Sequence, residues 1–346
     1  MKITTIGIDL AKNVFQVHGV NEHGKVAVKK QLKREQMAAF FANLPPCLIG
    51  MEACGGAHHW ARQLQRFGHT TKLMAPQFVK PYVKTNKNDA ADAEAICEAV
   101  ARPNMRFVPV KTTEQQAILS VHRARQNFVK ARTALANEIR GLLSEFGLVM
   151  PQKIQTIGLR LPEILEDGDN GLPGTFKQLL QRLGEHLKEL DRQVAELERD
   201  IQIWHRGNEA SRRLEKIPGI GPITASALVA TVGDAKNFSN GRQLAAWLGL
   251  VPRQNSSGGK ATLLGISKRG DRYLRTLMIH GARAVLRFAQ NKTDATSMWL
   301  NEVQTRRHVN VVTVALANKN ARIVWALLAH GSEFRAGYTS SESVAV

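Results

Sequence analysis

The sequence is poor in cysteine and lacks long apolar runs. Its three cysteines, Cys47, Cys54 and Cys97, form no CxxC pair and have no histidine at metal-ligand spacing, which argues against a zinc site and a disulfide framework. No apolar stretch approaches the roughly 20 residues that a membrane span needs, and the first residues lack the apolar segment of a signal peptide. We therefore expect a protein of a reducing compartment, the cytoplasm, with no membrane partner.

Acidic side chains are also scarce relative to basic ones. Lysine and arginine together number 48 against 29 aspartates and glutamates, which gives a net charge of +19 and a pI near 10.2. Such an excess favours a polyanionic partner, nucleic acid first and an acidic membrane surface second. Residues 1–110, 111–206 and 207–346 carry +7, +1 and +11 of this charge. The distribution predicts two nucleic-acid-facing domains joined by a structural element.

Residues 1–110 have the pattern of an α/β domain. Three strands joined by hairpins come first, and helices and strands alternate after them. The predicted strands are 3–9, 14–20, 25–30, 47–52 and 70–75, and the predicted helices are 35–44, 57–67 and 89–102. This is the element order of an RNase H-like fold.

Four carboxylates fall on these elements: Asp9, Glu52, Asp89 and Asp92. Asp9 and Glu52 each close a predicted strand, and the spacing of Asp89 and Asp92 places both on one face of a helix. In an RNase H-like fold these elements meet, so the four acids can converge on one or two Mg²⁺ ions, which prefer oxygen ligands and act on phosphates. Mn²⁺ is a suitable substitute. The alternative is that each acid is a capping or turn residue.

Two more acids on the last of these helices have a simpler explanation. Glu94 and Glu98 share the helix with Asp89 and Asp92, and we expect both to face solvent.

Residues 111–206 predict long helices and a coiled coil. One helix is expected at 113–147, and a stretch with glycine and proline, 158–174, separates it from a second helix. The second helix carries an unbroken heptad seam. Its members are Phe176, Leu180, Leu183, Leu187, Leu190, Val194, Leu197, Ile201 and Trp204. An antiparallel hairpin within one chain and a contact with a second protomer both remain open, and both can hold at once.

Residues 207–335 predict a mostly helical domain, followed by a polar, loose tail at 336–346. The turn Pro218-Gly-Ile-Gly-Pro222 is typical of a helix-hairpin-helix. In that motif Gly219 and Gly221 would let the backbone approach a phosphate, which exposed amides at the next helix can bind. A plain interhelical turn is the alternative.

The loop Ser256-Ser257-Gly-Gly-Lys260 offers a hydroxyl with chemical potential. A serine becomes a nucleophile only with a base, a metal or nearby cations, and from spacing alone such a sequence is more often a plain loop. Neither the pair His58-His59 nor His280 has a visible triad partner. Basic side chains that could hold phosphates surround the loop. They are Arg253, Lys260, Lys268, Arg269, Arg272 and Arg275.

Seven segments together carry a family resemblance. In the first domain they are Gly7-Ile-Asp9-Leu-Ala-Lys12, Met51-Glu52-Ala-Cys-Gly55 and Asn88-Asp89-Ala-Ala-Asp92-Ala. In the last domain they are Ile217-Pro-Gly-Ile-Gly221, Gly249-Leu-Val-Pro252, Ser257-Gly-Gly259 and Ile266-Ser-Lys-Arg-Gly-Asp-Arg-Tyr-Leu-Arg275. In this order, with a coiled-coil region between them, they resemble the DEDD-type transposases of the insertion-sequence family one-ten, including its eleven-eleven subgroup, and the Piv-type invertases.

This resemblance implies a RuvC-like first domain and a transposase domain with a serine nucleophile. The metal-binding acids would be Asp9, Glu52, Asp89 and Asp92, and the nucleophile would be Ser257, with Ser256 directly beside it. The resemblance also implies a structured bridge RNA that pairs with target and donor DNA. It further implies dimers that pair into tetramers, in which the serine of one protomer completes the acidic site of another.

The expected activity is therefore DNA recombination through a phosphoserine intermediate. Because no aromatic-rich RNA-recognition motif is present, we expect contact with the RNA through its shape and backbone. A metal-dependent Holliday-junction resolvase or nuclease with a structural serine loop is the first alternative, and a non-enzymatic DNA-binding scaffold is the second. The expected location is the cytoplasm, in association with the nucleoid.

Overall fold

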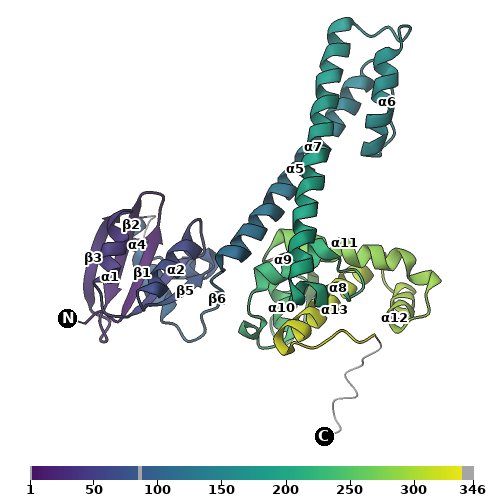
Figure 1. Cartoon of the computed structure of the whole chain (residues 1–346). Coiled ribbons are helices and arrows are strands. Elements are labelled where there is room, and N and C mark those ends of the chain that lie inside the picture. Colours follow the sequence, from purple (N-terminus) through teal and green to yellow (C-terminus); the bar gives the residue numbers. More distant parts are fainter. Residues whose placement is uncertain (1, 85–87, 337–346) are drawn as a thin grey trace. The chain divides into compact units, whose positions relative to one another are not determined.

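The computed structural model describes residues 2–84 and 88–336, and the chain forms two compact units, residues 1–114 and 115–346 (Figure 1). The boundary predicted at residue 110 lies close to the boundary between the units. The second unit contains both the predicted coiled-coil region and the predicted transposase domain, so their separation at residue 206 stays a prediction. Most of the predicted tail, 337–346, lies outside the described residues.

The first unit is built on a six-stranded sheet with the order β3-β2-β1-β4-β5-β6. β1, β2 and β3 are antiparallel, β1, β4 and β5 are parallel, and β6 is antiparallel to β5. The strands are β1 (Thr5–Leu10), β2 (Val14–Val20), β3 (Val26–Lys33), β4 (Leu48–Glu52), β5 (Thr70–Met74) and β6 (Phe107–Val108). The helices are α1 (Gln36–Ala42), α2 (Ala57–Arg66), α3 (Pro76–Val79) and α4 (Asp89–Val100), with a 3₁₀ turn at Lys80–Tyr82. The predicted α/β order is confirmed, and β6 and α3 are additions too short to show a sequence period.

Close contact between α4 and β1 fixes the geometry of this unit. A Cβ on Gly7 of β1 would lie 2.2 Å from the Ala93 oxygen and 2.3 Å from the Cys97 nitrogen of α4. A Cβ on Gly50 of β4 would lie 2.7 Å from the Val100 side chain. Glycine at these two positions therefore lets the helix backbone approach the sheet more closely than any side chain would permit.

The second unit begins with a long helical hairpin made of α5 (Thr113–Ser144), α6 (Ile154–Glu166) and α7 (Gly174–Gly207). Ion pairs link α5 to α7: Arg125 Nε lies 2.9 Å from Glu198 Oε1, and Arg132 Nη1 lies 2.9 Å from Asp191 Oδ1. Because the partner number falls as the α5 number rises, the two helices are antiparallel (Figure 1).

Much of the stretch 158–174, predicted to separate the two helices, is itself helical. α6 continues to Glu166 and contains Pro162. Its buried side chains Ile157 and Leu161 pack in one cluster with α5 and α7, and Leu161 lies against Gly184 of α7. This packing outweighs the cost of a proline inside the helix.

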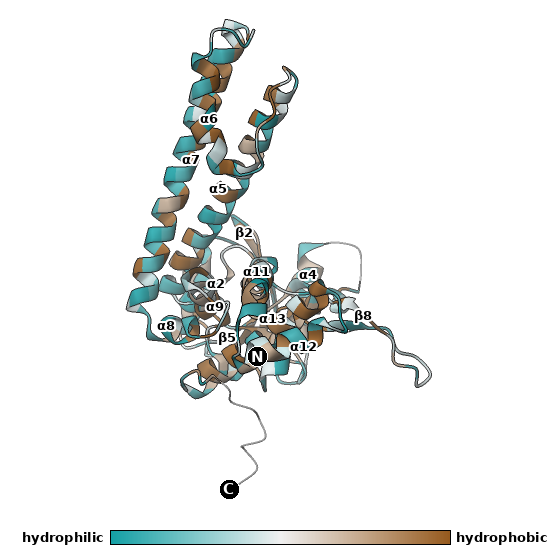
Figure 2. Ribbon diagram, turned by 90° about the vertical axis from the view of Figure 1, so that its right-hand side faces the viewer, coloured by the Kyte–Doolittle hydropathy of each residue, from teal (hydrophilic) through white to brown (hydrophobic). Residues whose placement is uncertain are grey.

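The heptad seam of α7 packs against other helices of the same chain. Five of its members are at most 4% exposed: Leu180, Leu187, Leu190, Val194 and Ile201. Leu180, Leu187 and Leu190 belong to the cluster with α5 and α6, and Ile201 packs with Ile118 and Ala230. The apolar residues alternate with hydrophilic ones along both long helices (Figure 2). The structure therefore contains the intrachain hairpin, and a contact of this region with a second protomer stays a prediction.

The rest of the second unit is a helical cluster. Its helices are α8 (Glu209–Glu215), α9 (Pro222–Val232), α10 (Gly241–Trp247), α11 (Arg272–Phe288), α12 (Ala295–Gln304) and α13 (Val309–His330), with 3₁₀ turns at Ala235–Asn237 and Ala289–Asn291. Its core includes Leu228, Leu244, Met278 and Leu316. An antiparallel pair, β7 (Pro252–Gln254) and β8 (Leu263–Ile266), flanks the predicted loop 256–260, and the sequence analysis predicted neither strand.

Among the described residues, one helix, α13, is long and apolar enough to cross a membrane by length and composition. The expectation that no apolar stretch approaches this length was therefore too strict. Val312, Leu316 and Val324 of α13 are fully buried in the helical cluster, which explains the composition as that of a core helix.

The turn between α8 and α9 packs against α11. Gly219 has φ +87°, and a Cβ on it would lie 2.8 Å from the Gly281 oxygen. A Cβ on Gly281 would lie 1.8 Å from the Gly219 oxygen. This contact explains the need for glycine at position 219 by packing of the interhelical turn, and the expected approach of its backbone to a phosphate stays a prediction. Gly221 has open space around it and caps α9, so its predicted role stays a prediction.

We expect Gly281→Ala to destabilise the second unit by about 2–3 kcal/mol, because overpacking a rigid backbone contact forces the helices apart. The measurement is chemical denaturation followed by circular dichroism. Gly141→Ala is the matched control, since Gly141 lies in α5 with open space around it. The Gly141→Ala control should stabilise the second unit by about 0.5–1 kcal/mol, because alanine has a higher helix propensity than glycine. Equal effects of the two variants would contradict the packing role of Gly281.

Candidate functional site

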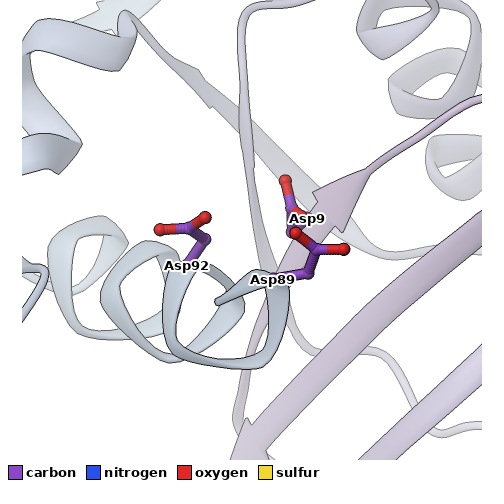
Figure 3. A group of neighbouring side chains, drawn as sticks. All are labelled: Asp9, Asp89 and Asp92. Carbon is purple, nitrogen blue, oxygen red and sulfur yellow. The ribbon is translucent and has the colours of Figure 1, made fainter. Parts of the chain in front are cut away.

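Three of the four predicted acids converge at one edge of the sheet. One carboxylate oxygen from each of Asp9, Asp89 and Asp92 lies within 4.8 Å of the others. Asp9 comes from the end of β1, and the other two come from the first turn of α4 (Figure 3). The tight packing at Gly7 brings these two elements together, so residues of the core determine the spacing of the acids.

The start of α4 suits negative charge. Asn88 caps the helix, and its side-chain oxygen accepts a hydrogen bond of 2.9 Å from the backbone N–H of Ala90. Free N–H groups and the helix dipole make an N-terminal turn electropositive, which partly offsets the repulsion between Asp89 and Asp92.

Glu52 lies beside this group of three. It ends β4, one residue beyond the cross-strand pair of Ile8 with Met51, so it is adjacent to Asp9 on the neighbouring strand. Burial raises the pKa of the Glu52 carboxyl, and the charges of Asp9 and Asp92 raise this pKa further. All four predicted acids therefore share one electrostatic environment, although Glu52 is not among the three acids whose oxygens lie within 4.8 Å of one another.

The donor set fits a hard divalent cation. Three half-buried or exposed carboxylates supply only oxygen, which Mg²⁺ and Mn²⁺ accept and which zinc or copper sites seldom use alone. Cys54 is close, but burial and then the charges of Glu52 and Asp9 raise the pKa of its thiol, so it stays neutral and is a poor ligand. A bound cation would offset the charges of Asp9 and Asp92, which add to the effect of burial in raising the pKa of Glu52.

The two remaining acids of α4 are outside the site. Glu94 is exposed, as expected. Glu98 differs from the expectation, because it is half-buried and paired with Lys84, at 3.0 Å, and with Arg102. Hydrogen bonds from these two cations lower the pKa of Glu98.

The two serines lie at the end of the β7–β8 hairpin, and their hydroxyls differ. Ser256 Oγ accepts hydrogen bonds from Gln254 Nε2 at 3.0 Å and from the Thr262 N–H at 3.3 Å. Within the described residues, the Ser257 hydroxyl has no such partner, while its backbone oxygen accepts from the Lys260 N–H at 3.0 Å. Gly258 and Gly259, with φ of +54° and +77°, complete the turn. Ser257 is thus exposed with an available hydroxyl.

The predicted phosphate-binding cations divide into two kinds. Five of them are exposed around the hairpin: Arg253, Lys260, Lys268, Arg269 and Arg272. Arg275 is an exception, because it is only 9% exposed and its guanidinium donates to the backbone oxygens of Leu248 and Arg269, both at 3.2 Å. It holds the loop before α11 in place, and its predicted contact with phosphate stays a prediction.

Sequence reasoning missed a buried polar network next to this loop. His122 of α5 lies 3.0 Å from the Tyr273 hydroxyl of α11 and 3.0 Å from Ser226 Oγ of α9. Burial, and secondarily Arg125, lowers the pKa of His122 to about 4, so it is neutral at pH 7. The network connects the long hairpin to the start of α11. No sequence pattern indicates this network, because its three members are far apart along the chain.

Two family models match the chain. One, described as the transposase family IS116/IS110/IS902, matches residues 211–297, which include Ser257. The other, a transposase model of the DEDD type, matches residues 6–147, which include Asp9, Glu52, Asp89 and Asp92.

Similar proteins cover nearly the whole chain. A "Probable family 20 transposase" of Pseudomonas aeruginosa is 57% identical over 97% of this chain and 100% of its own length. A "Transposase for insertion sequence element IS1111A" of Coxiella burnetii is 48% identical, over 97% and 92%. A "Transposase for insertion sequence element IS1328" of Yersinia enterocolitica is 46% identical, over 96% and 98%. With both ends matched and full-length relatives this similar, the chain belongs to the IS116/IS110/IS902 family of transposases.

Proposed function

We propose that this transposase cuts and rejoins target and donor DNA through a covalent bond to Ser257, under the guidance of a structured bridge RNA. The observation that carries the proposal is the convergence of Asp9, Asp89 and Asp92 in a chain with a net charge of +19. Acids gathered at one point of a basic protein are suited to hold a divalent cation against a phosphate.

The first unit would act as an RuvC-like, RNase H-like domain. Its strand order, with β1 central and acids at the ends of β1 and β4 and at the start of α4, supports this assignment. Asp9, Asp89 and Asp92 would hold Mg²⁺, or Mn²⁺ in its place, and Glu52 would complete the set. The bound cation would draw charge from a phosphate oxygen and lower the pKa of a coordinated hydroxyl.

Ser257 would attack the scissile phosphate. Its Oγ forms a bond to phosphorus while one phosphorus–oxygen bond of the DNA backbone breaks, and the serine proton is passed to the departing sugar oxygen. Attack by a sugar hydroxyl of another strand then forms the new DNA bond, and Ser257 regains its proton. The number of phosphoester bonds is conserved, so rejoining needs no external energy source.

The exposed cations around the hairpin support contact with the DNA backbone. Arg253, Lys260 and Arg269 can bind phosphates without reading bases, which leaves the choice of sequence to pairing with the RNA. In dimers paired into tetramers, the serine of one protomer would serve the acids of another. The protein would then work in the cytoplasm, at the nucleoid.

Removal of divalent metal tests this function. We expect purified protein, RNA transcribed from the element's non-coding end, and donor and target DNA to give joined products in Mg²⁺. Chelation by EDTA should abolish them, because the acids cannot act on a phosphate without a cation, and Mn²⁺ should restore them. Products would be measured by sequencing of the new junctions. Undiminished joining in EDTA would contradict the metal centre, and undiminished joining without the RNA would contradict guidance.

A metal-dependent junction resolvase or nuclease is the second candidate. It is favoured by the fact that the three closest acids lie in one unit that contains no part of the serine hairpin. In that case the hairpin is structural and the product is cut DNA.

A further inference from the structure

Basic side chains line one exposed face of α11 beyond the serine hairpin. Arg272, His280, Arg283 and Arg287 are all exposed, and with the exposed Thr276 they recur every three or four residues. This spacing places them on a single face of a helix. At 1.5 Å of rise per residue, the stripe from Arg272 to Arg287 is about 22 Å long.

A groove continues this face. It has a volume of about 500 Å³ and lies between α11, the end of α12 and the start of α13. Its polar lining residues are His280, Arg283, Arg287, Gln290 and Gln304, and Ala284, Leu286 and Val309 supply the apolar part. Arginine and glutamine supply hydrogen-bond donors, and no aspartate or glutamate is among the lining residues.

Three arginines of the stripe have no counter-ion in the described parts of the chain. Within residues 2–84 and 88–336, no carboxylate lies within ion-pair distance of Arg272, Arg283 or Arg287. Some other exposed arginines of the unit are paired, for example Arg192 with Glu189 and Arg306 with Glu302. Arg287 instead lies over the ring of Phe288, which is 56% exposed. An unpaired row of guanidinium groups on a helix is suited to an anion with evenly repeated charges.

We propose that the α11 groove binds the phosphate backbone of a nucleic acid. A duplex carries one charge per about 1.7 Å of its axis, so several phosphates fit along the stripe. Arginine binds phosphate through two parallel hydrogen bonds, and the two glutamines can reach sugar or phosphate oxygens. The proposal rests on the proposed function for the source of the strand, which is either the DNA being rearranged or the guiding RNA.

The test is the salt dependence of binding by the full chain. The variant is Arg283→Ala with Arg287→Ala, and fluorescence anisotropy gives its affinity for a DNA duplex and for an RNA duplex over a series of KCl concentrations. Each lost phosphate contact lowers the slope of log affinity against log salt by about one, so the double variant should lower it by about two. A lower slope with DNA alone or with RNA alone identifies which nucleic acid the groove binds. A lower slope with both indicates that the groove recognises only the phosphate backbone.

The matched control is Arg160→Ala with Arg192→Ala, which removes the same charge from paired positions of the long hairpin. Its slope should equal that of the unaltered protein. Arg283→Lys with Arg287→Lys should keep the slope, which separates loss of charge from misfolding. An unchanged slope with both DNA and RNA in the alanine variant would overturn the proposal. The groove is tested by the salt slope of binding and the catalytic proposal by DNA joining, so failure of one is distinguishable from failure of the other.

Discussion

Asp9→Asn is expected to lower DNA joining by about a thousandfold, which corresponds to loss of several kcal/mol of electrostatic stabilisation in the transition state. Asn keeps the shape of the side chain but removes one of the three converging charges. Asp9 is also the only one of the three that comes from the sheet, so no residue of α4 can replace it. Quantification of joined DNA over time measures the effect.

Glu94→Gln is the matched control for Asp9→Asn. Glu94 is an exposed carboxylate on α4 outside the converging group, so its neutralisation should leave joining within about twofold, as for most surface changes. The pKa of Glu52 should also fall toward its ordinary value in Asp9→Asn, because one of the charges that raise it is gone. Full activity of Asp9→Asn would show that the acids are not the metal centre.

Ser257→Ala is expected to eliminate the covalent protein–DNA adduct and to lower joining by about a thousandfold or more, because no neighbouring group replaces a lost nucleophile. A denaturing gel with labelled DNA detects the adduct. Ser256→Ala should retain most activity, since the Ser256 hydroxyl is engaged with Gln254 and Thr262 inside the hairpin.

Three outcomes of the serine experiment are distinct. Loss of the adduct and of joining in Ser257→Ala alone supports the recombinase. Loss of the adduct and of joining in Ser256→Ala alone would identify Ser256 as the nucleophile. Cleavage that survives in both variants favours the resolvase, in which the metal centre activates water and the hairpin is structural.

The sequence predicted the first unit well because its signals are local. β1 and β4 are short apolar segments with consecutive buried residues, which is typical of a strand in the interior of a sheet, and an acid at the end of each indicates the same sheet edge. The position of α4 on the sheet was not predictable in the same way. It depends on contacts of Gly7 with Ala93 and Cys97, which lie far along the chain.

Predictions for the second unit were weaker where tertiary contacts outweigh local preference. The glycine and proline of α6 indicated a loop, but packing of Ile157 and Leu161 on α7 maintains a helix. Arg275 looks like its exposed neighbours in the sequence, and only its two backbone partners show that it is structural. The strands of the serine hairpin are three and four residues long, which is too short for a period to be recognised.

The serine hairpin differs from the acidic site in how it is supported. None of the residues of β7 and β8 is buried, and the hairpin extends away from the helices of its own unit (Figure 2). Few buried contacts mean that folding of the helical cluster contributes little to the orientation of Ser257. Under the proposed function, ordering of Ser257 must then draw on binding energy from the nucleic acids. If Ser257 is the nucleophile proposed above, a protomer without nucleic acid has a preformed group of acids but no aligned nucleophile, which would limit unguided cleavage of the host genome.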